Sequence, residues 1–154
     1  MIILIRMEHL IVPNNILLSE VCSLLEEGKE VWLKAKGCSM LPFIRGDKDS
    51  VLLSGNQEIY LGDIVLALLE GNRYVLHRVV GLEGENVILM GDGNVAGQEK
   101  CMLKDVKAIA LMIDRGEKII EVRSVGHQKI AAVWKLLLPL RRYLLALYGK
   151  IYKK

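Results

Sequence analysis

Three polar side chains of the chain are of types that together can cleave a peptide bond: Ser39, His77 and Asp92. Ser39 follows a predicted strand, His77 lies inside another, and Asp92 stands in the turn Gly91-Asp92-Gly93-Asn94. A serine hydroxyl is a weak nucleophile until a base lies within hydrogen-bond distance, and a carboxylate can orient that base. The order of the three residues along a chain is free. If the fold brings them together, acyl transfer is the expected chemistry.

Each of these residues also has a purely structural interpretation. A histidine in a strand is often a core residue, and an aspartate in such a turn often bonds its own backbone. Cys38, next to Ser39, could serve as a thiol nucleophile, although a small buried cysteine is the commoner role. Lys34 and Lys36 could serve as a base, but they lie on the strand that precedes the serine. Residue types and spacing alone therefore do not decide whether these residues form a catalytic site.

Four short motifs follow one another along the chain. They are Ser39-Met40-Leu41-Pro42 with Gly46-Asp47, then Gly62-Asp63-Ile64-Val65, His77-Arg78-Val79, and Gly91-Asp92-Gly93-Asn94. No single motif is specific, but the four in this order resemble the type I signal peptidases and the LexA-type serine peptidases. The resemblance covers about residues 31–113, and the histidine at the base position is that of the His branch of signal peptidases.

The resemblance implies a catalytic role for several residues. Ser39 would attack the peptide carbonyl and His77 would act as the general base, for which an imidazole is well suited near neutral pH. Many relatives carry a second aspartate shortly after the last motif, where this chain has Val95-Ala96-Gly97-Gln98-Glu99. Asp92 is therefore the first choice for the acid that orients His77, and Glu99 is the substitute.

Further residues are expected to shape the site. Relatives often have a serine at the position of Gly37, so backbone N–H groups near Ser39 would have to stabilise the oxyanion here. The neighbours of the nucleophile are expected to contact the oxyanion and the substrate: Cys38, Met40 and Pro42. Residues of and after the later motifs are expected to support the site: Arg78, Asn94 and Glu99. Substrates of the family are extended precursor or signal peptides with small residues before the cleaved bond, which bind by adding a strand to a sheet edge.

Two other functions remain possible. The same scaffold could bind extended peptides without cleaving them, because a fold does not fix a function. It could also be a LexA-type regulator that cleaves itself, and Ala96-Gly97 resembles the bond cut in such proteins. That branch uses a lysine base and a DNA-binding helical domain upstream, whereas this chain has His77 and one short predicted helix before Ser39.

The elements that must position these residues form one domain of mixed composition. The chain has 154 residues, of which 52% are hydrophobic and 25% charged, so it can bury a core. Leu17, Val21, Leu24 and Leu25 recur at helical spacing, which predicts a helix over 15–27 that ends at Gly28. The segment 1–12 is predicted as a buried strand, because it is too short and too often interrupted by charge for a membrane anchor.

Short strands are predicted from residue 31 to about residue 124. Alternating or β-branched segments are separated by Gly-Asp and Gly-Asn turns, and Arg115-Gly116-Glu117 is predicted as a hairpin turn. The predicted strands are 31–35, 49–53, 63–70, 73–82, 86–90, 106–113 and 118–124. The expected fold is α+β, dominated by an antiparallel LexA/signal-peptidase-like sheet with a short N-terminal helix. Residues 1–126 would be the catalytic domain. Three widely spaced cysteines without a CxxC motif predict neither a disulfide framework nor a zinc site, and no cofactor is implied.

The last 28 residues, 127–154, differ in charge from the rest. They hold seven Lys and Arg residues and no Asp or Glu, whereas residues 1–126 are net acidic. Residues 130–152 predict a basic amphipathic helix, with Arg141 off the basic stripe and Pro139 as a kink or a break. We expect this helix to lie on an anionic membrane surface, the alternative being a helix packed on the domain. A nucleic-acid partner is not expected, and the protein would be peripherally membrane-associated or cytoplasmic, on a side that the sequence does not indicate.

Overall fold

The structure is a computed structural model that describes residues 2–4 and 14–152. Its elements follow in chain order: β1 Ile2–Leu4, α1 Asn14–Glu26, β2 Glu30–Lys34, β3 Ser50–Ser54, β4 Ile64–Leu69, β5 Arg73–Glu83, β6 Asn86–Met90, β7 Glu99–Met102, the 3-10 turn η1 Leu103–Asp105, β8 Val106–Asp114, β9 Ile119–Glu121, α2 Val125–Leu136, the 3-10 turn η2 Leu138–Leu140, and α3 Arg141–Tyr152. The predicted N-terminal strand is present only as β1. The rest of that segment, with His9, lies outside the described residues.

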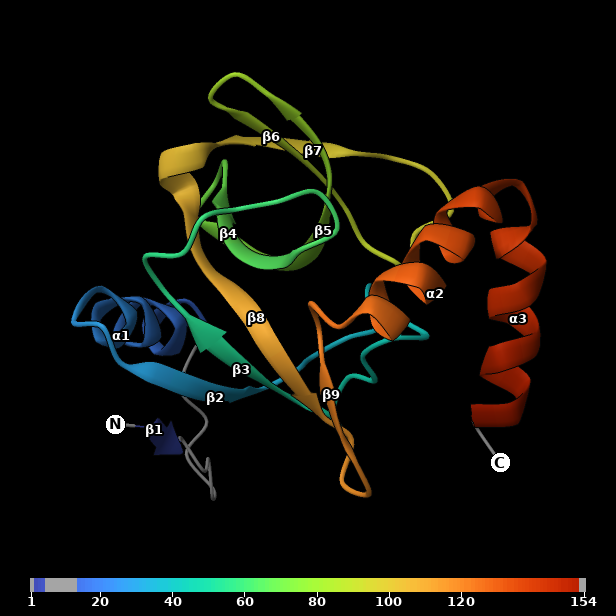
Figure 1. The fold of residues 1–154 in the computed structure, drawn as a ribbon, viewed down its shortest axis with the longest axis horizontal. Helices are drawn as coiled ribbons and strands as arrows, with labels where there is room; N and C mark the ends of the chain where they lie inside the picture. The colour runs from blue at the N-terminus through green and yellow to red at the C-terminus, as the bar shows by residue number, and fades with distance from the viewer. Residues whose placement is uncertain (1, 5–13, 153–154) are drawn as a thin grey trace.

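Nine strands form one strongly curled sheet, with α1 on one side and the α2–α3 pair on the other (Figure 1). The strand order is β1-β2-β3-β8-β4-β5-β6-β7, and β9 pairs with β8. All the pairs are antiparallel except β1 with β2. The predicted class, α+β with a mostly antiparallel sheet, is therefore confirmed.

Two apolar clusters hold the sheet in this shape. One lies between α1 and the sheet and includes Val21, Leu25 and Ile113, each at most 1% exposed. The other lies inside the curl formed by β4 to β8 and includes Val65 and Leu89, both fully buried. β3 and β4 contribute nearly continuous runs of buried residues to these clusters, because both of their faces are covered.

The turns follow the chemistry expected of their residues. Gly28 ends α1 with a φ of 81° and donates its N–H to the carbonyl of Leu25 at 3.0 Å, a common helix termination. The predicted hairpin turn at 115–117 joins β8 to β9, where the N–H of Arg115 donates to the carbonyl of Lys118 at 3.0 Å. The predicted break at Pro139 is confirmed, because Pro139 lies in η2 between α2 and α3.

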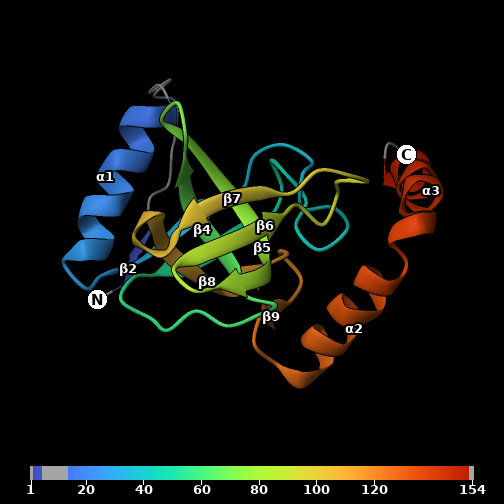
Figure 2. The ribbon, with the colours of Figure 1, turned by 90° about the horizontal axis from the view of Figure 1, so that it is seen from above.

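The C-terminal helices stand at the side of the sheet away from α1 (Figures 1 and 2). The hydroxyl of Ser124 caps α2 by accepting the N–H of His127 at 3.3 Å. Among the described residues, no helix has the length and apolar character needed to cross a bilayer.

Candidate active site

Ser39, His77 and Glu99 line one groove of about 980 Å³. Ser39 comes from the turn after β2, His77 from β5, and Glu99 from the first position of β7. Apolar side chains such as Leu76 and Val51 form much of the lining, and Asn94 borders it. The curl of the sheet therefore brings residues that are 60 positions apart in the chain to one surface.

The nucleophile turn is held by close backbone packing. The N–H of Gly93 donates to the carbonyl of Ser39 at 2.8 Å. A Cβ at Gly91 would collide with the carbonyl of Ser39, and a Cβ at Gly93 would collide with the carbonyl of Cys38. The Gly-Asp-Gly-Asn turn is thus the surface on which the backbone of Ser39 rests, which explains why glycines flank Asp92.

A second glycine contact fixes the other end of the turn. A Cβ at Gly46 would collide with the backbone carbonyl of Gly37, and Gly37 itself has a φ of 74°. The N–H of Asp47 donates to the carbonyl of Ala35 at 2.8 Å. Gly46-Asp47, the second part of the first motif, therefore closes the loop that carries Ser39.

The imidazole of His77 is buried beside a carboxylate. His77 is 6% exposed, and its Nδ1 lies 3.2 Å from Oε2 of Glu99, within ion-pair range although the pair does not meet the geometry of a hydrogen bond. Catalytic hydrogen bonds are often loose before substrate binds. The other oxygen of Glu99 accepts a bond from Arg73 Nη2 at 2.5 Å. Glu99 thus contacts Arg73 with one oxygen and lies beside the imidazole of His77 with the other.

Burial is the main influence on the base. Desolvation lowers the pKa of His77 below its ordinary value of 6.5, and the Glu99 carboxylate opposes that shift while the Arg73 guanidinium adds to it. The imidazole is therefore neutral at pH 7, which is the form that can accept a proton.

Asp92, the first choice for the orienting acid, is held in a different interaction. It is 4% exposed, and both of its oxygens accept bonds from Arg78, with Nε at 2.8 Å from Oδ1 and Nη2 at 2.8 Å from Oδ2. Glu99, the substitute, provides the carboxylate beside His77. The two carboxylates therefore have separate partners, Arg78 for Asp92 and His77 for Glu99.

Arg78 connects three of the four motifs. Besides Asp92, its Nη1 donates to the carbonyl of Gly62 at 2.8 Å, and its guanidinium lies 5.0 Å from the ring centre of Phe43. Nη2 lies 3.3 Å from Nε2 of His127, a buried residue of α2. Burial and the Arg78 charge lower the pKa of His127 to about 4, so this imidazole is neutral and serves the packing around Arg78.

The remaining candidate residues are distributed around the nucleophile. The side chain of Met40 is 4% exposed, lines the floor of the groove, and accepts the N–H of Asp92 at 3.5 Å through its sulfur. Cys38 is exposed and free. Pro42 lines a second groove, beside α2.

Three residues of this region were not anticipated as site residues. Arg73 starts β5 and bonds Glu99, and no motif marks it. Trp134 of α2 donates Nε1–H to the carbonyl of Asp92 at 2.8 Å, and Arg141 of α3 donates to the carbonyl of Asn94 at 3.0 Å. The position of Arg141 off the basic stripe of its helix was the available signal that it faces inward. No three His, Cys, Asp or Glu side chains gather as metal ligands in the part of the chain that the structure describes.

A family model described as Peptidase S24-like matches residues 7–113, which is more than half of the chain. The chain therefore belongs to the Peptidase S24-like family, the LexA/signal-peptidase-like serine peptidases. The resemblance read from the four motifs is confirmed at this level. No curated protein matches the chain in sequence.

The charges around His77 predict opposite shifts in the pH profile of activity. A peptidase that uses His77 as its general base requires the neutral imidazole, so its kcat/KM should fall only as the pH drops below 6.5. Arg73→Gln removes a charge that lowers the pKa of His77, so the acid limb moves to higher pH. Glu99→Gln removes a carboxylate that raises this pKa, so the limb moves to lower pH.

The matched control for these variants is Lys100→Gln. Lys100 neighbours Glu99 on β7, and its ammonium lies 3.7 Å from Glu83 rather than at His77. Its pH profile should overlay that of the wild type. If Arg73→Gln and Lys100→Gln shift the limb equally, the charge of Arg73 has no specific effect on the pKa of His77.

Proposed function

We propose that the protein is a serine endopeptidase of the signal-peptidase type, with Ser39 as nucleophile, His77 as general base and Glu99 as the acid that orients His77. The observation that carries this proposal is that the three residues line one groove, with Nδ1 of His77 3.2 Å from Glu99. A carboxylate at Nδ1 favours the tautomer whose Nε2 is free to accept a proton.

The reaction then follows from these roles. Oγ of Ser39 bonds the carbonyl carbon of the peptide while its proton moves to Nε2 of His77. The imidazolium returns this proton to the leaving amine as the C–N bond breaks, which leaves an ester on Ser39. Water attacks the ester while His77 takes its proton, and the imidazolium returns this proton to Oγ of Ser39 as the ester C–O bond breaks and the acid product leaves. Backbone N–H groups of the turn around Ser39 would stabilise the oxyanion.

The sheet offers an edge for an extended substrate. In the described part of the chain, β6 pairs with β5 only from Arg78 onward, while residues 73–77 pair with β4 on their other side and line the groove. An extended peptide can therefore add a strand along 73–77 and pass His77. We propose precursor or signal peptides with small residues before the cleaved bond as the substrates, because the family resemblance implies this class.

The covalent step can be tested with an activated ester. We would incubate the protein with an extended peptide that ends in alanine p-nitrophenyl ester and map the adduct by mass spectrometry after acid quenching. The expected result is acylation of Ser39 in the wild type and in Cys38→Ala, and none in Ser39→Ala. An adduct on Cys38, or none in folded protein, would overturn the assignment. A fragment ending at Ala96, formed without added peptide, would instead support the self-cleaving regulator.

A further inference from the structure

The C-terminal helices carry a large share of the exposed apolar side chains. Leu136 is 81% exposed, Tyr143 68% and Ile151 67%. The other exposed large apolar residues of this region are Val125, Ile130, Val133, Leu138, Leu140 and Leu147. We call this set the α2–α3 apolar surface. Exposed apolar residues are ordinary when scattered, but a set gathered on neighbouring elements indicates an interaction site.

The geometry of α3 makes this surface continuous. Tyr143, Leu147 and Ile151 are four residues apart, so they form a stripe along one side of the helix. Figures 1 and 2 show α3 as the outermost element at its end of the molecule. The stripe is therefore exposed on an element at the periphery of the molecule.

Basic side chains border the apolar surface. Lys129, Lys135, Arg142 and Lys150 are all exposed, and Arg142 and Lys150 lie on the flank of α3 beside the stripe. No Asp or Glu occurs anywhere in 127–154. The surface is thus apolar at its centre and cationic at its border.

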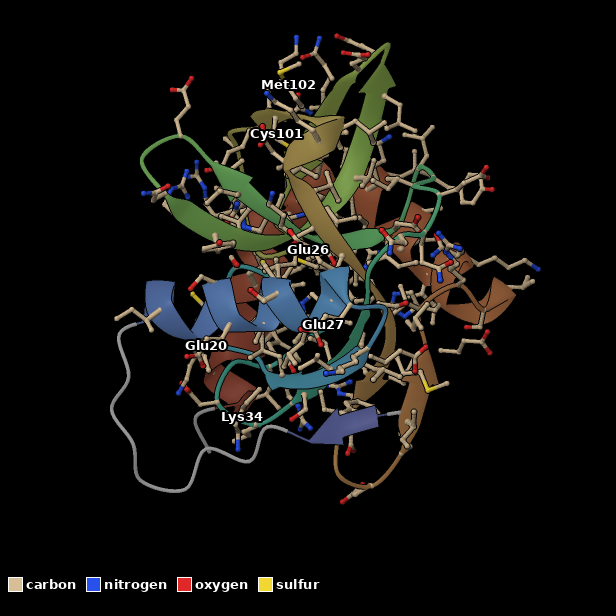
Figure 3. All side chains as sticks on the ribbon, turned by 90° about the vertical axis from the view of Figure 1, so that its left-hand side faces the viewer. Glu20, Glu26, Glu27, Lys34, Cys101 and Met102 are labelled. Carbon is tan, nitrogen blue, oxygen red and sulfur yellow. The ribbon has the colours of Figure 1, made fainter. Side chains whose placement is uncertain are left out.

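The opposite end of the molecule carries exposed acidic residues that the C-terminal helices lack. Glu20 and Glu26 lie on α1, which has no basic residue, and Glu27 follows it. All three are exposed, and Figure 3 shows them on the side that faces away from the C-terminal helices. Figure 3 also shows Lys34 on this side, and Glu27 pairs with Lys29, so the α1 end has mixed charge. An anionic surface would therefore attract the α2–α3 end more strongly than the α1 end.

A cleft beside α2 extends the apolar surface. It has a volume of about 430 Å³, and Ile130, Val133 and Leu137 line it together with Arg115 and Lys118 of the β8–β9 hairpin. Arg115 is paired with Asp49, whereas Lys118 is exposed. An apolar lining with an exposed lysine suits an acyl chain below an anionic headgroup.

Hydrogen bonds join the α2 and α3 helices to the turn that carries Asp92 and Asn94. Arg141 is 4% exposed and donates to the carbonyls of Asn94 and Trp134, while Trp134 bonds the carbonyl of Asp92. These two residues are therefore anchors within the protein, and the surface for a partner is formed by the others.

We propose that the α2–α3 apolar surface docks the protein on an anionic lipid bilayer, with its apolar side chains below the headgroups and its lysines and arginine among them. Docking would hold the groove of Ser39 and His77 at a fixed height above the bilayer, because Trp134 and Arg141 join both regions. A nucleic-acid site would need cations in a polar groove, whereas these cations surround leucine, isoleucine and tyrosine. The inference does not require that the protein cleave peptides.

Vesicle flotation tests the proposal. The wild type should float with phosphatidylcholine vesicles that contain 30 mol% phosphatidylglycerol, bind pure phosphatidylcholine much less, and lose binding as salt rises. The double variant Leu136→Asn/Leu147→Asn should bind more than about tenfold more weakly, since each buried apolar side chain contributes about 1.5–3 kcal/mol. Arg142→Gln/Lys150→Gln should lose about 30-fold, at about 1 kcal/mol per charge near the surface.

Matched controls come from exposed residues elsewhere. Leu61→Asn/Leu82→Asn removes two exposed leucines, at 61% and 41% exposure, and Lys100→Gln/Lys104→Gln removes two exposed lysines. Both should bind like the wild type, and circular dichroism with thermal melting checks that every variant folds. Equal losses in test and control variants, or no flotation of folded wild type, would overturn the proposal. Binding to a DNA duplex but not to vesicles would replace it with a nucleic-acid site.

Discussion

Ser39→Ala and His77→Ala should each lower kcat for peptide cleavage by about 10⁴-fold or more, with little change in stability. Removal of either the nucleophile or its base removes the covalent pathway, and only oxyanion stabilisation and binding remain. Because the two residues act as a unit, the double variant should be no slower than the worse single variant. Initial rates of cleavage, measured by mass spectrometry on saturating peptide, give these values.

The control for this prediction is Cys38→Ala, next to the nucleophile in the same turn. Its side chain is exposed, so its loss should leave both folding and rate close to those of the wild type. If the loss of kcat in the double variant equals the product of the two single losses, Ser39 and His77 do not act in one step.

Asp92→Ala should destabilise the protein by about 3–5 kcal/mol, because it leaves the charge of buried Arg78 without its partner. Arg78 is 6% exposed, so water cannot replace the lost carboxylate easily. Glu99→Ala should cost far less stability, because its carboxylate is at the groove edge, while the rate of cleavage falls sharply. Urea unfolding followed by circular dichroism measures the first effect, and peptide cleavage measures the second.

This pair of variants separates a structural carboxylate from a catalytic one. Asp92→Asn is a gentler version that retains the shape and weakens only the charge pair with Arg78. A stable Asp92→Ala protein that has lost activity would assign the orienting role to Asp92 rather than Glu99. Equal stability losses in both alanine variants would show that Glu99 is also a structural residue.

The strands and the helices could be predicted where periodicity was clear. Alternation and glycine turns located β2 to β6, β8 and the hairpin to β9, with errors of at most three residues at the ends. β7, Glu99–Met102, was missed because a stretch of Glu-Lys-Cys-Met has neither β-branched residues nor alternation. Its pairing with β6 makes it a strand, and that pairing is a tertiary fact.

The same missing strand explains why the orienting acid stayed undecided. β6 pairs with β5 so that Met90 opposes Arg78, and Asp92 therefore follows β6 beside Arg78. β7 returns along β6 with Glu99 opposite Leu89, which brings Glu99 to the groove of His77. No local sequence pattern contains this register, so both carboxylates remained candidates.

The C-terminal region shows another limit of pattern reading. The basic amphipathic character and the break at Pro139 could be predicted, but the inward side chains could not. The position of Arg141 off the basic stripe indicates a different environment but not its partner, and Arg141 and Trp134 bond the turn that carries Asp92 and Asn94. Inward contacts depend on what lies beside a helix, which periodicity does not report.

The most direct test of the account is the cleavage of peptides by the purified wild type. A panel of extended precursor peptides, with alanine, glycine or serine before the candidate bond and matched members with leucine or phenylalanine there, would be analysed by mass spectrometry. The account predicts cuts after the small residues that disappear in Ser39→Ala. Folded wild type that binds these peptides and leaves every one intact would contradict it, and would make the groove a site for peptide binding alone.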